Sequence, residues 1–137
     1  MSTLSFVLDA SAVLAFLQGE PGQDTVADAL QNARCVVTAA NQAEIVAKAL
    51  DRGHSTDAIQ TILAELAYDV VDTTAADGAL AGRLRAATRA AGLSLGDRLC
   101  LAAATRLNAA VLTADRPWLA LAATLKLDIR SIRPEAH

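Results

Sequence analysis

The sequence is poor in the residues that most metal centres and covalent catalysts use. It contains two histidines, His54 and His137, and two cysteines, Cys35 and Cys100, which are far apart and form no CxxC pair. A histidine-based zinc site and a Ser-His-Asp triad are therefore poorly supported. Isolated cysteines of this kind are typical of buried, small apolar residues in a reducing compartment, so we expect a cytoplasmic protein.

Long hydrophobic runs are also missing. No apolar stretch reaches the roughly 18 residues that a membrane span requires. Residues 4–17 are interrupted by Asp9 and follow no basic segment, which argues against a signal peptide. Aromatic residues make up only 3% of the chain, whereas the apolar fraction is 53% and rich in alanine, which favours closely packed helices. We expect residues 1–137 to form a single domain with its own core and no membrane contact.

Positive charge is scarce in the first half of the chain only. The net charge of −3 argues against a protein that coats DNA in general. Residues 1–68 carry three basic and eight acidic side chains, whereas residues 69–137 carry nine and seven, and eight of those nine are arginines. Arginine suits bidentate contact with phosphate. A solvated helical face explains most such arginines, and phosphate binding is the sharper alternative.

Strands and helices alternate along the sequence. The apolar run Phe6-Val7-Leu8 ends at Asp9 and leads directly into a helix, which is typical of a central parallel strand buried on both faces. We expect strands at about residues 4–8, 35–37, 68–72, 109–112 and 127–130. Helices are expected at about residues 10–18, 23–31, 38–49, 55–67, 74–92 and 94–108, with a short one at Trp118. Four of these helices follow a hydroxyl residue that can cap them, and these residues are Thr38, Ser55, Thr74 and Ser94. This alternation implies an α/β fold in which helices cover both faces of a parallel sheet.

Four acidic residues do not fit their surroundings. Asp9 and Asp115 each follow an apolar strand, Glu44 lies among apolar residues of a helix, and Asp97 lies in the first turn of another helix. Each position has an ordinary explanation. Asp9 and Asp115 could cap helices, Glu44 could pair with Lys48 one turn later, and Asp97 could interact with a helix dipole.

The four acids together indicate a metal site. The carboxyl ends of parallel strands meet at one edge of a sheet, so these side chains could converge there. Two carboxylates about 4 Å apart repel each other by roughly 4 kcal/mol at an effective dielectric constant near 20, and a hard cation offsets that repulsion. Oxygen ligands without histidine or cysteine select Mg²⁺ or Mn²⁺. Such ions, held by carboxylates, activate water for phosphodiester hydrolysis.

Four segments resemble the ordered acidic motifs of PIN-domain ribonucleases, and most closely those of the VapC toxins of bacterial toxin–antitoxin pairs. They are Val7-Leu8-Asp9-Ala10-Ser11, Ala43-Glu44, Ser94-Leu95-Gly96-Asp97-Arg98 and Leu112-Thr113-Ala114-Asp115-Arg116-Pro117-Trp118. The first segment alone is weak, whereas the last two in succession are quite specific. The resemblance covers roughly residues 4–133. One mild departure is Asn41-Gln42-Ala43 before Glu44, where a more apolar lead-in is common.

The resemblance implies a three-layer α/β/α sandwich around a parallel sheet of about five strands. It implies a metal-dependent endoribonuclease that uses Mg²⁺ (or Mn²⁺), cuts tRNA or rRNA, and forms a homodimer. A cognate antitoxin protein would inhibit it by laying a peptide along the groove near the active site. By position, the catalytic and metal-binding acids would be Asp9, Glu44, Asp97 and Asp115, with Ser11 and Thr113 in support.

The roles of several other residues can be interpreted in two ways. Arg98 and Arg116 each adjoin a proposed ligand and could hold the scissile phosphate or neutralise the acids. Arg85 and Arg89, four residues apart on one predicted helix, could contact the RNA backbone or form a solvated face. Trp118 is more consistent with core packing than with stacking on a base. The apolar faces of the predicted helices at residues 10–18, 23–31 and 55–67 predict a surface that an antitoxin segment or a second copy covers.

Two other classes of function compete with a nuclease. A phosphotransfer enzyme or phosphatase of the haloacid-dehalogenase kind also has an aspartate after its first strand, but it needs a second one where Ser11 stands. No GxxxxGK[ST] motif occurs, which excludes a P-loop ATPase. A catalytically silent, PIN-like binding module is the remaining alternative, and the complete set of acids argues against it.

Overall fold

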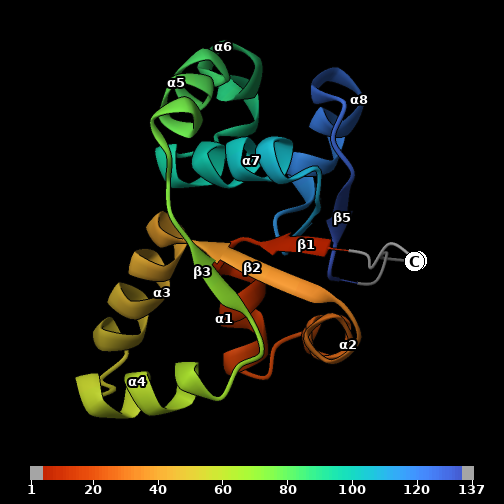
Figure 1. Cartoon of the computed structure of the whole chain (residues 1–137). Coiled ribbons are helices and arrows are strands. Elements are labelled where there is room, and N and C mark those ends of the chain that lie inside the picture. The colour runs from red at the N-terminus through yellow and green to blue at the C-terminus, as the bar shows by residue number, and fades with distance from the viewer. Residues whose placement is uncertain (1–4, 134–137) are drawn as a thin grey trace.

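A parallel β-sheet runs through the middle of the molecule, and helices cover both of its faces (Figure 1). The computed structural model describes residues 5–133. In chain order the elements, of which η1 and η2 are 3₁₀ helices, are β1 (Ser5–Leu8), α1 (Ala10–Leu17), α2 (Gln23–Asn32), β2 (Arg34–Thr38), α3 (Ala39–Asp51), α4 (Thr56–Ala64), β3 (Asp69–Val71), α5 (Ala75–Arg83), α6 (Arg85–Thr88), η1 (Arg89–Ala91), α7 (Leu95–Leu107), β4 (Ala110–Thr113), η2 (Arg116–Leu121), α8 (Ala122–Leu125) and β5 (Ile129–Ser131). The predicted α/β/α sandwich around a five-stranded parallel sheet is confirmed.

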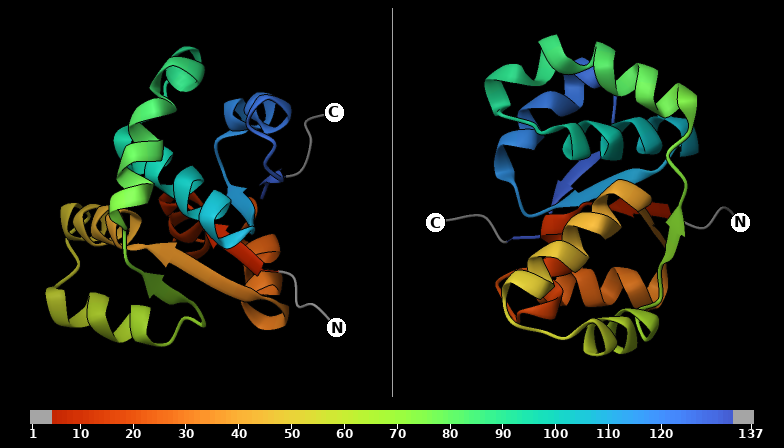
Figure 2. Two further views of the ribbon diagram at one scale, coloured as in Figure 1. Left: turned by 45° about the horizontal axis from the view of Figure 1, so that its top comes forward. Right: turned by 90° about the vertical axis from the view of Figure 1, so that its left-hand side faces the viewer.

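The two helical layers are visible edge-on in Figure 2. One layer contains α1, α2, α3 and α4, and its apolar side chains join those of one sheet face in a single cluster. The other layer contains α5, α6, α7, η2 and α8, and it covers the opposite face of the sheet. Within the described part of the chain, no helix is both long and apolar enough to cross a membrane.

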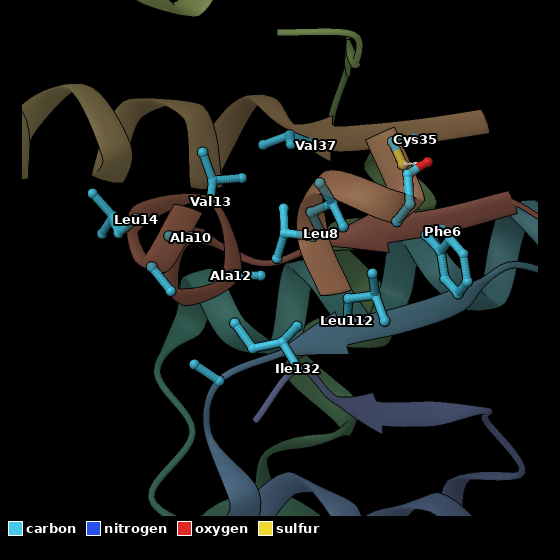
Figure 3. Packing of buried hydrophobic residues seen from close by; sticks show 14 of the residues in the cluster. Phe6, Leu8, Ala10, Ala12, Val13, Leu14, Cys35, Val37, Leu112 and Ile132 are labelled. Carbon is cyan, nitrogen blue, oxygen red and sulfur yellow. Dashed lines mark hydrogen bonds between the residues drawn. The ribbon is translucent and has the colours of Figure 1, made fainter. Parts of the chain in front are cut away.

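The central strand β1 is buried because its side chains alternate between the two layers. Phe6 and Leu8 belong to the buried cluster that also contains Val13 of α1 and Val37 of β2 (Figure 3). Val7 points the other way, into the cluster that contains side chains of α7. Burial on both faces explains why this stretch is apolar at every position, as the sequence predicted for a central strand.

The strand order β3-β2-β1-β4-β5 determines where a ligand can bind. From β1 the chain adds β2 and β3 on one side, and it later returns to add β4 on the other side. Open α/β sheets bind ligands at the point where the order reverses, beyond the carboxyl ends of the strands. Here that point lies between β1 and β4. The backbone N–H of Asp9 donates to the carbonyl of Leu112 over 3.1 Å, so Asp9 is held against β4 at this position.

Four helices begin at the predicted hydroxyl caps. The hydroxyl of Thr38 accepts a hydrogen bond from the third residue of α3, and the hydroxyl of Ser55 does the same for α4. Thr74 and Ser94 each form a reciprocal capping box with the aspartate three residues later. These bonds satisfy backbone donors that the helix itself leaves unpaired. They also fix where α3 and α7 start, and both helices carry a candidate acid.

The segment predicted as one helix over residues 74–92 is divided into α5, α6 and η1. The guanidinium Nη1 of Arg98 donates to the carbonyl of Ala81 over 3.0 Å. In a continuous helix that carbonyl would accept from residue 85. Gly82 lies near the break, and glycine favours a helix less than most residues do. A side chain from α7 thus replaces a backbone donor, and α5 ends there.

The third and fifth strands also differ from the prediction. β3 spans only Asp69–Val71 and lies at the edge of the sheet, where Val70 is 48% exposed. β5 begins at Ile129 and not at residue 127. The N–H of Leu127 donates to the carbonyl of Ala122 over 3.0 Å, so this residue closes the end of α8.

Candidate active site

Asp9 is a buried carboxylate at the end of the central strand, with an exposed fraction of 2%. Its Oδ1 accepts from the backbone N–H of Ala12 over 2.8 Å, so Asp9 does cap α1. The hydroxyl of Ser11 donates to Oδ1 over 2.7 Å, and the hydroxyl of Thr113 donates to Oδ2 over 2.6 Å. Both carboxylate oxygens are therefore fixed by donors that come from α1 and from β4.

The surroundings of Asp9 oppose its negative charge. Burial raises the pKa of Asp9 from 3.8 to about 6, although the hydrogen bonds from Thr113, Ser11 and Ala12 act in the opposite direction. The negative charge of Asp97 raises this pKa further. The bonds orient the carboxylate and do not fully compensate for lost hydration. A cation bound here would favour the ionised form.

Ser11 and Thr113 connect the ends of β1 and β4. The Ser11 hydroxyl accepts from the N–H of Ala114 over 2.9 Å, and the Thr113 hydroxyl accepts from the N–H of Asp115 over 3.0 Å. The two hydroxyl oxygens lie 3.4 Å apart. Each hydroxyl thus donates to Asp9 and accepts from the backbone that follows β4. Thr113 therefore links the backbone N–H of Asp115 to the Asp9 carboxylate through a single hydroxyl.

Asp97 combines a capping role with proximity to Asp9. The backbone N–H of Ser94 donates to Oδ2 of Asp97 over 2.9 Å, and the N–H of Asp97 donates to the Ser94 hydroxyl over 3.2 Å. Asp97 therefore completes the capping box at the start of α7. Its charge also raises the pKa of both Asp9 and Cys100, so α7 delivers a second carboxylate to the end of the central strands.

Asp115 is held by a tryptophan. Its side chain makes no capping bond to η2, so the interpretation of Asp115 as a side-chain cap is wrong. The indole Nε1 of Trp118 donates to Oδ2 of Asp115 over 3.1 Å. Trp118 is fully buried at 0% exposure, which confirms its predicted role in core packing. A rigid ring anchored in the core thus orients this carboxylate.

Glu44 lies half-buried on α3. Within residues 5–133 no ion pair joins Glu44 to Lys48, so the structure does not contain the predicted i,i+4 pair. One turn earlier, the side-chain Nδ2 of Asn41 donates to the carbonyl of Gly96 over 3.2 Å. Since Gly96 adjoins Asp97, this bond brings the acid-bearing start of α3 to the acid-bearing start of α7.

The four acids have the oxygen donors and the negative charge that a hard divalent cation requires, but in this structure their side chains are too far apart to bind one together. Within the described residues 5–133, no three His, Cys, Asp or Glu side chains are close enough to hold a metal ion. One oxygen of Asp97 is turned toward Ser94, and one of Asp115 is turned toward Trp118. Oxygen donors around a buried carboxylate of raised pKa are the chemistry that Mg²⁺ or Mn²⁺ satisfies.

The four candidate arginines lie in different surroundings. Arg98 is buried, and besides Ala81 it donates from Nε to the carbonyl of Ser94 over 3.4 Å. The structure therefore does not bring Arg98 to an RNA-binding surface, because its guanidinium joins α7 to α5. Arg85 and Arg89 are exposed on α6 and η1, and Arg116 is exposed next to Asp115.

Comparisons with known proteins agree with this architecture. The family model described as "PIN domain" matches residues 6–123. The chain is similar to VapBC-1 from nontypeable Haemophilus influenzae, with TM-score 0.70, 18% identity, and coverage of 94% of this chain and 98% of that one. For DNA-bound VapBC from Salmonella typhimurium the values are 0.70, 14%, 94% and 98%. For FitAcB from Neisseria gonorrhoeae they are 0.69, 16%, 93% and 97%. No curated protein matches the chain significantly.

The raised pKa of Asp9 predicts a particular dependence of stability on pH. Because the folded pKa is about 6 and the ordinary value 3.8, the folded protein holds this proton more tightly than the unfolded chain does. The stabilising contribution is complete below pH 3.8 and is lost as the pH rises through about 6. It amounts to roughly 3 kcal/mol. In chelator at pH 7, Asp9→Asn should therefore melt several degrees above the wild type.

Thermal melts of both proteins between pH 4 and pH 8 measure this effect. The difference in melting temperature should shrink as the pH falls below about 5, because the wild-type carboxyl is then protonated as well. Taking the difference removes the contributions of the other titrating groups. A gap that stays constant across the range, or a variant that never melts higher, would show that Asp9 is an ordinary helix cap.

Proposed function

The chain belongs to the PIN-domain family, and from this premise we propose that it is a metal-dependent endoribonuclease and the toxin of a toxin–antitoxin pair. One observation carries the proposal. Asp9 is a buried carboxylate of raised pKa at the point where the strand order reverses, and the charge of Asp97 acts on it. A fold that needed only a helix cap would have no reason to gather such charges, whereas a cation-dependent site requires them.

In this proposal Asp9 and Asp97 hold the cation, and Asp115 and Glu44 complete the site. A bound Mg²⁺ or Mn²⁺ would lower the pKa of an attacking water and stabilise negative charge on the phosphate and the leaving oxygen. The protein's part is orientation. Ser11 and Thr113 hold both oxygens of Asp9, and the indole of Trp118 holds Asp115.

The reaction would be hydrolysis of an RNA phosphodiester, in tRNA or rRNA. A bond forms between water oxygen and phosphorus while the bond from phosphorus to a sugar oxygen breaks, and that oxygen takes up a proton. The exposed Arg85 and Arg89 belong to the same helical layer as α7, which carries Asp97 (Figure 2). They and Arg116 are the proposed contacts to the RNA backbone. A substrate of this kind is consistent with a cytoplasmic protein.

The proposed antitoxin site is an apolar groove in the opposite layer. Side chains of α1, α3 and α4 line a groove of about 320 Å³, with Arg52 and His54 among the residues around it. Ile62 of α4 is 40% exposed there, which is unusual for an apolar side chain of this size. A toxin–antitoxin complex from Klebsiella pneumoniae is among the similar structures, which supports a protein partner for this groove. A homodimer is proposed on the same family grounds.

Purified protein freed of its partner should cut structured RNA when Mg²⁺ or Mn²⁺ is present and stop when a chelator is added. Asp9→Asn and Asp97→Asn should each lower cleavage by more than the roughly 10–100-fold that loss of an outer-shell partner causes. The exposed Asp24→Asn is the matched control and should cut normally. Undiminished cleavage in excess chelator would overturn the metal mechanism. RNA left intact by metal-saturated protein would favour a silent binding module.

RNA affinity should depend on the exposed arginines. Replacing Arg85 and Arg89 by alanine should weaken binding and reduce the slope of log affinity against log salt concentration by roughly 1.5, because fewer counterions are released. Arg34→Ala with Arg52→Ala removes the same charge from other exposed positions and should leave the slope unchanged. Fluorescence anisotropy over a salt series measures both. Equal slopes for the two double variants would assign Arg85 and Arg89 to ordinary solvated surface.

The groove can be tested separately from the acids. Ile62→Glu places a charge at a half-exposed apolar position, so the protein should fold and cut RNA but no longer retain its cognate antitoxin. Thr61→Glu adds the same charge at the neighbouring exposed residue and should still retain it. Copurification after coexpression gives the answer. Retention by Ile62→Glu as strong as that by the wild type would place the antitoxin elsewhere.

A further inference from the structure

Asn41 is a buried polar side chain where two acid-bearing helices meet. Its exposed fraction is 1%, and its backbone N–H is held by the hydroxyl of Thr38 over 3.0 Å at the start of α3. Its Nδ2 donates to the carbonyl of Gly96 over 3.2 Å, in the first turn of α7. Glu44 lies one turn after Asn41, and Asp97 directly follows Gly96. The bond therefore joins the two turns from which these acids project.

The amide of Asn41 can point in only one direction. The carbonyl of Gly96 is an acceptor, so the nitrogen of the amide must face it. The other end of the amide, Oδ1, is then buried and has no hydrogen-bond partner within the described residues. Leaving a buried acceptor unpaired is unfavourable, and native proteins rarely do so. An apolar side chain would avoid this penalty, so helix packing alone does not explain an asparagine here.

The contact also adds little to the fold itself. Gly96 lies inside α7, where its carbonyl already serves as acceptor for the helix. Removing the Asn41 amide would consequently leave no backbone group unsatisfied and would remove one unpaired acceptor. What would be lost is the fixed spacing between the start of α3 and the start of α7.

We propose that Asn41 is a positioning residue of the acidic site, which holds the Glu44 turn of α3 against the Asp97 turn of α7 through its bond to Gly96. This inference rests on the proposed metal-dependent function. Outer-shell groups that orient ligands typically change metal affinity by about 10–100-fold when they are removed. Asn41 should act in this way without touching the cation or the RNA.

Mn²⁺ binding, followed by the electron paramagnetic resonance signal of the free ion, tests the proposal without reference to catalysis. Asn41→Ala should bind Mn²⁺ about 10–100-fold more weakly than the wild type, yet melt within a few degrees of it in chelator. Asn41→Asp keeps the shape and an acceptor but loses the amide donor, so it should also bind more weakly. RNA cleavage should fall in both variants.

Gln42→Ala is the matched control. The neighbouring Gln42 accepts from the hydroxyl of Tyr68 over 2.7 Å, so this variant also loses one side-chain hydrogen bond, but it has no link to α7. It should bind Mn²⁺ as the wild type does. Wild-type affinity in Asn41→Ala, or affinity retained or raised in Asn41→Asp, would overturn the positioning role. So would an equal loss in Gln42→Ala. If the wild type itself binds no Mn²⁺, the proposed function fails first.

Discussion

The structure depends on placing one carboxylate at the end of a strand that is buried on both faces. Because β1 is flanked by β2 and β4 and covered by two helical layers, the residue that follows it is nearly as buried as the strand. Asp9 must therefore receive its hydrogen bonds from the protein. Ser11, Ala12 and Thr113 supply them, and Ser11 and Thr113 also join the ends of β1 and β4. The hydroxyl groups that stabilise the buried carboxylate of Asp9 thus also fix the positions of the two strand ends around it.

Capping and catalysis are not opposing explanations for these acids. Asp9 and Asp97 both accept backbone hydrogen bonds at helix starts, and the capping geometry is what turns each carboxylate toward the end of the sheet. The carboxylate of Asp115 is also oriented by a hydrogen bond, but its donor is the buried indole of Trp118 and not a backbone N–H. In each case a contact that also serves the local structure fixes at least one carboxylate oxygen. Such preorganisation is what a metal or phosphate site requires.

The two faces of the sheet divide the proposed tasks. The layer with α5, α6 and α7 contains the exposed Arg85 and Arg89 and also Asp97, whereas the layer with α1, α3 and α4 contains the apolar groove. Asp9 and Asp115 lie at the ends of the central strands β1 and β4, and the charge of Asp97 acts on Asp9. A partner bound in the groove would therefore contact α1 and α3, the helices that carry Ser11 and Glu44. Inhibition by such a partner needs no long-range change of conformation.

The sequence alone determined what depends on contacts within about four residues: the apolar runs that form strands, the caps at Thr38, Ser55, Thr74 and Ser94, and the capping role of Asp9. Only the tertiary structure decided what depends on distant partners. Arg98 donates a hydrogen bond to the carbonyl of Ala81, where α5 ends. The indole of Trp118 donates to Asp115, and the side chain of Asn41 donates to the carbonyl of Gly96. A donor or acceptor can choose among many partners far along the chain, and packing of the layers selects one. The local sequence pattern therefore does not predict which distant partner is bonded.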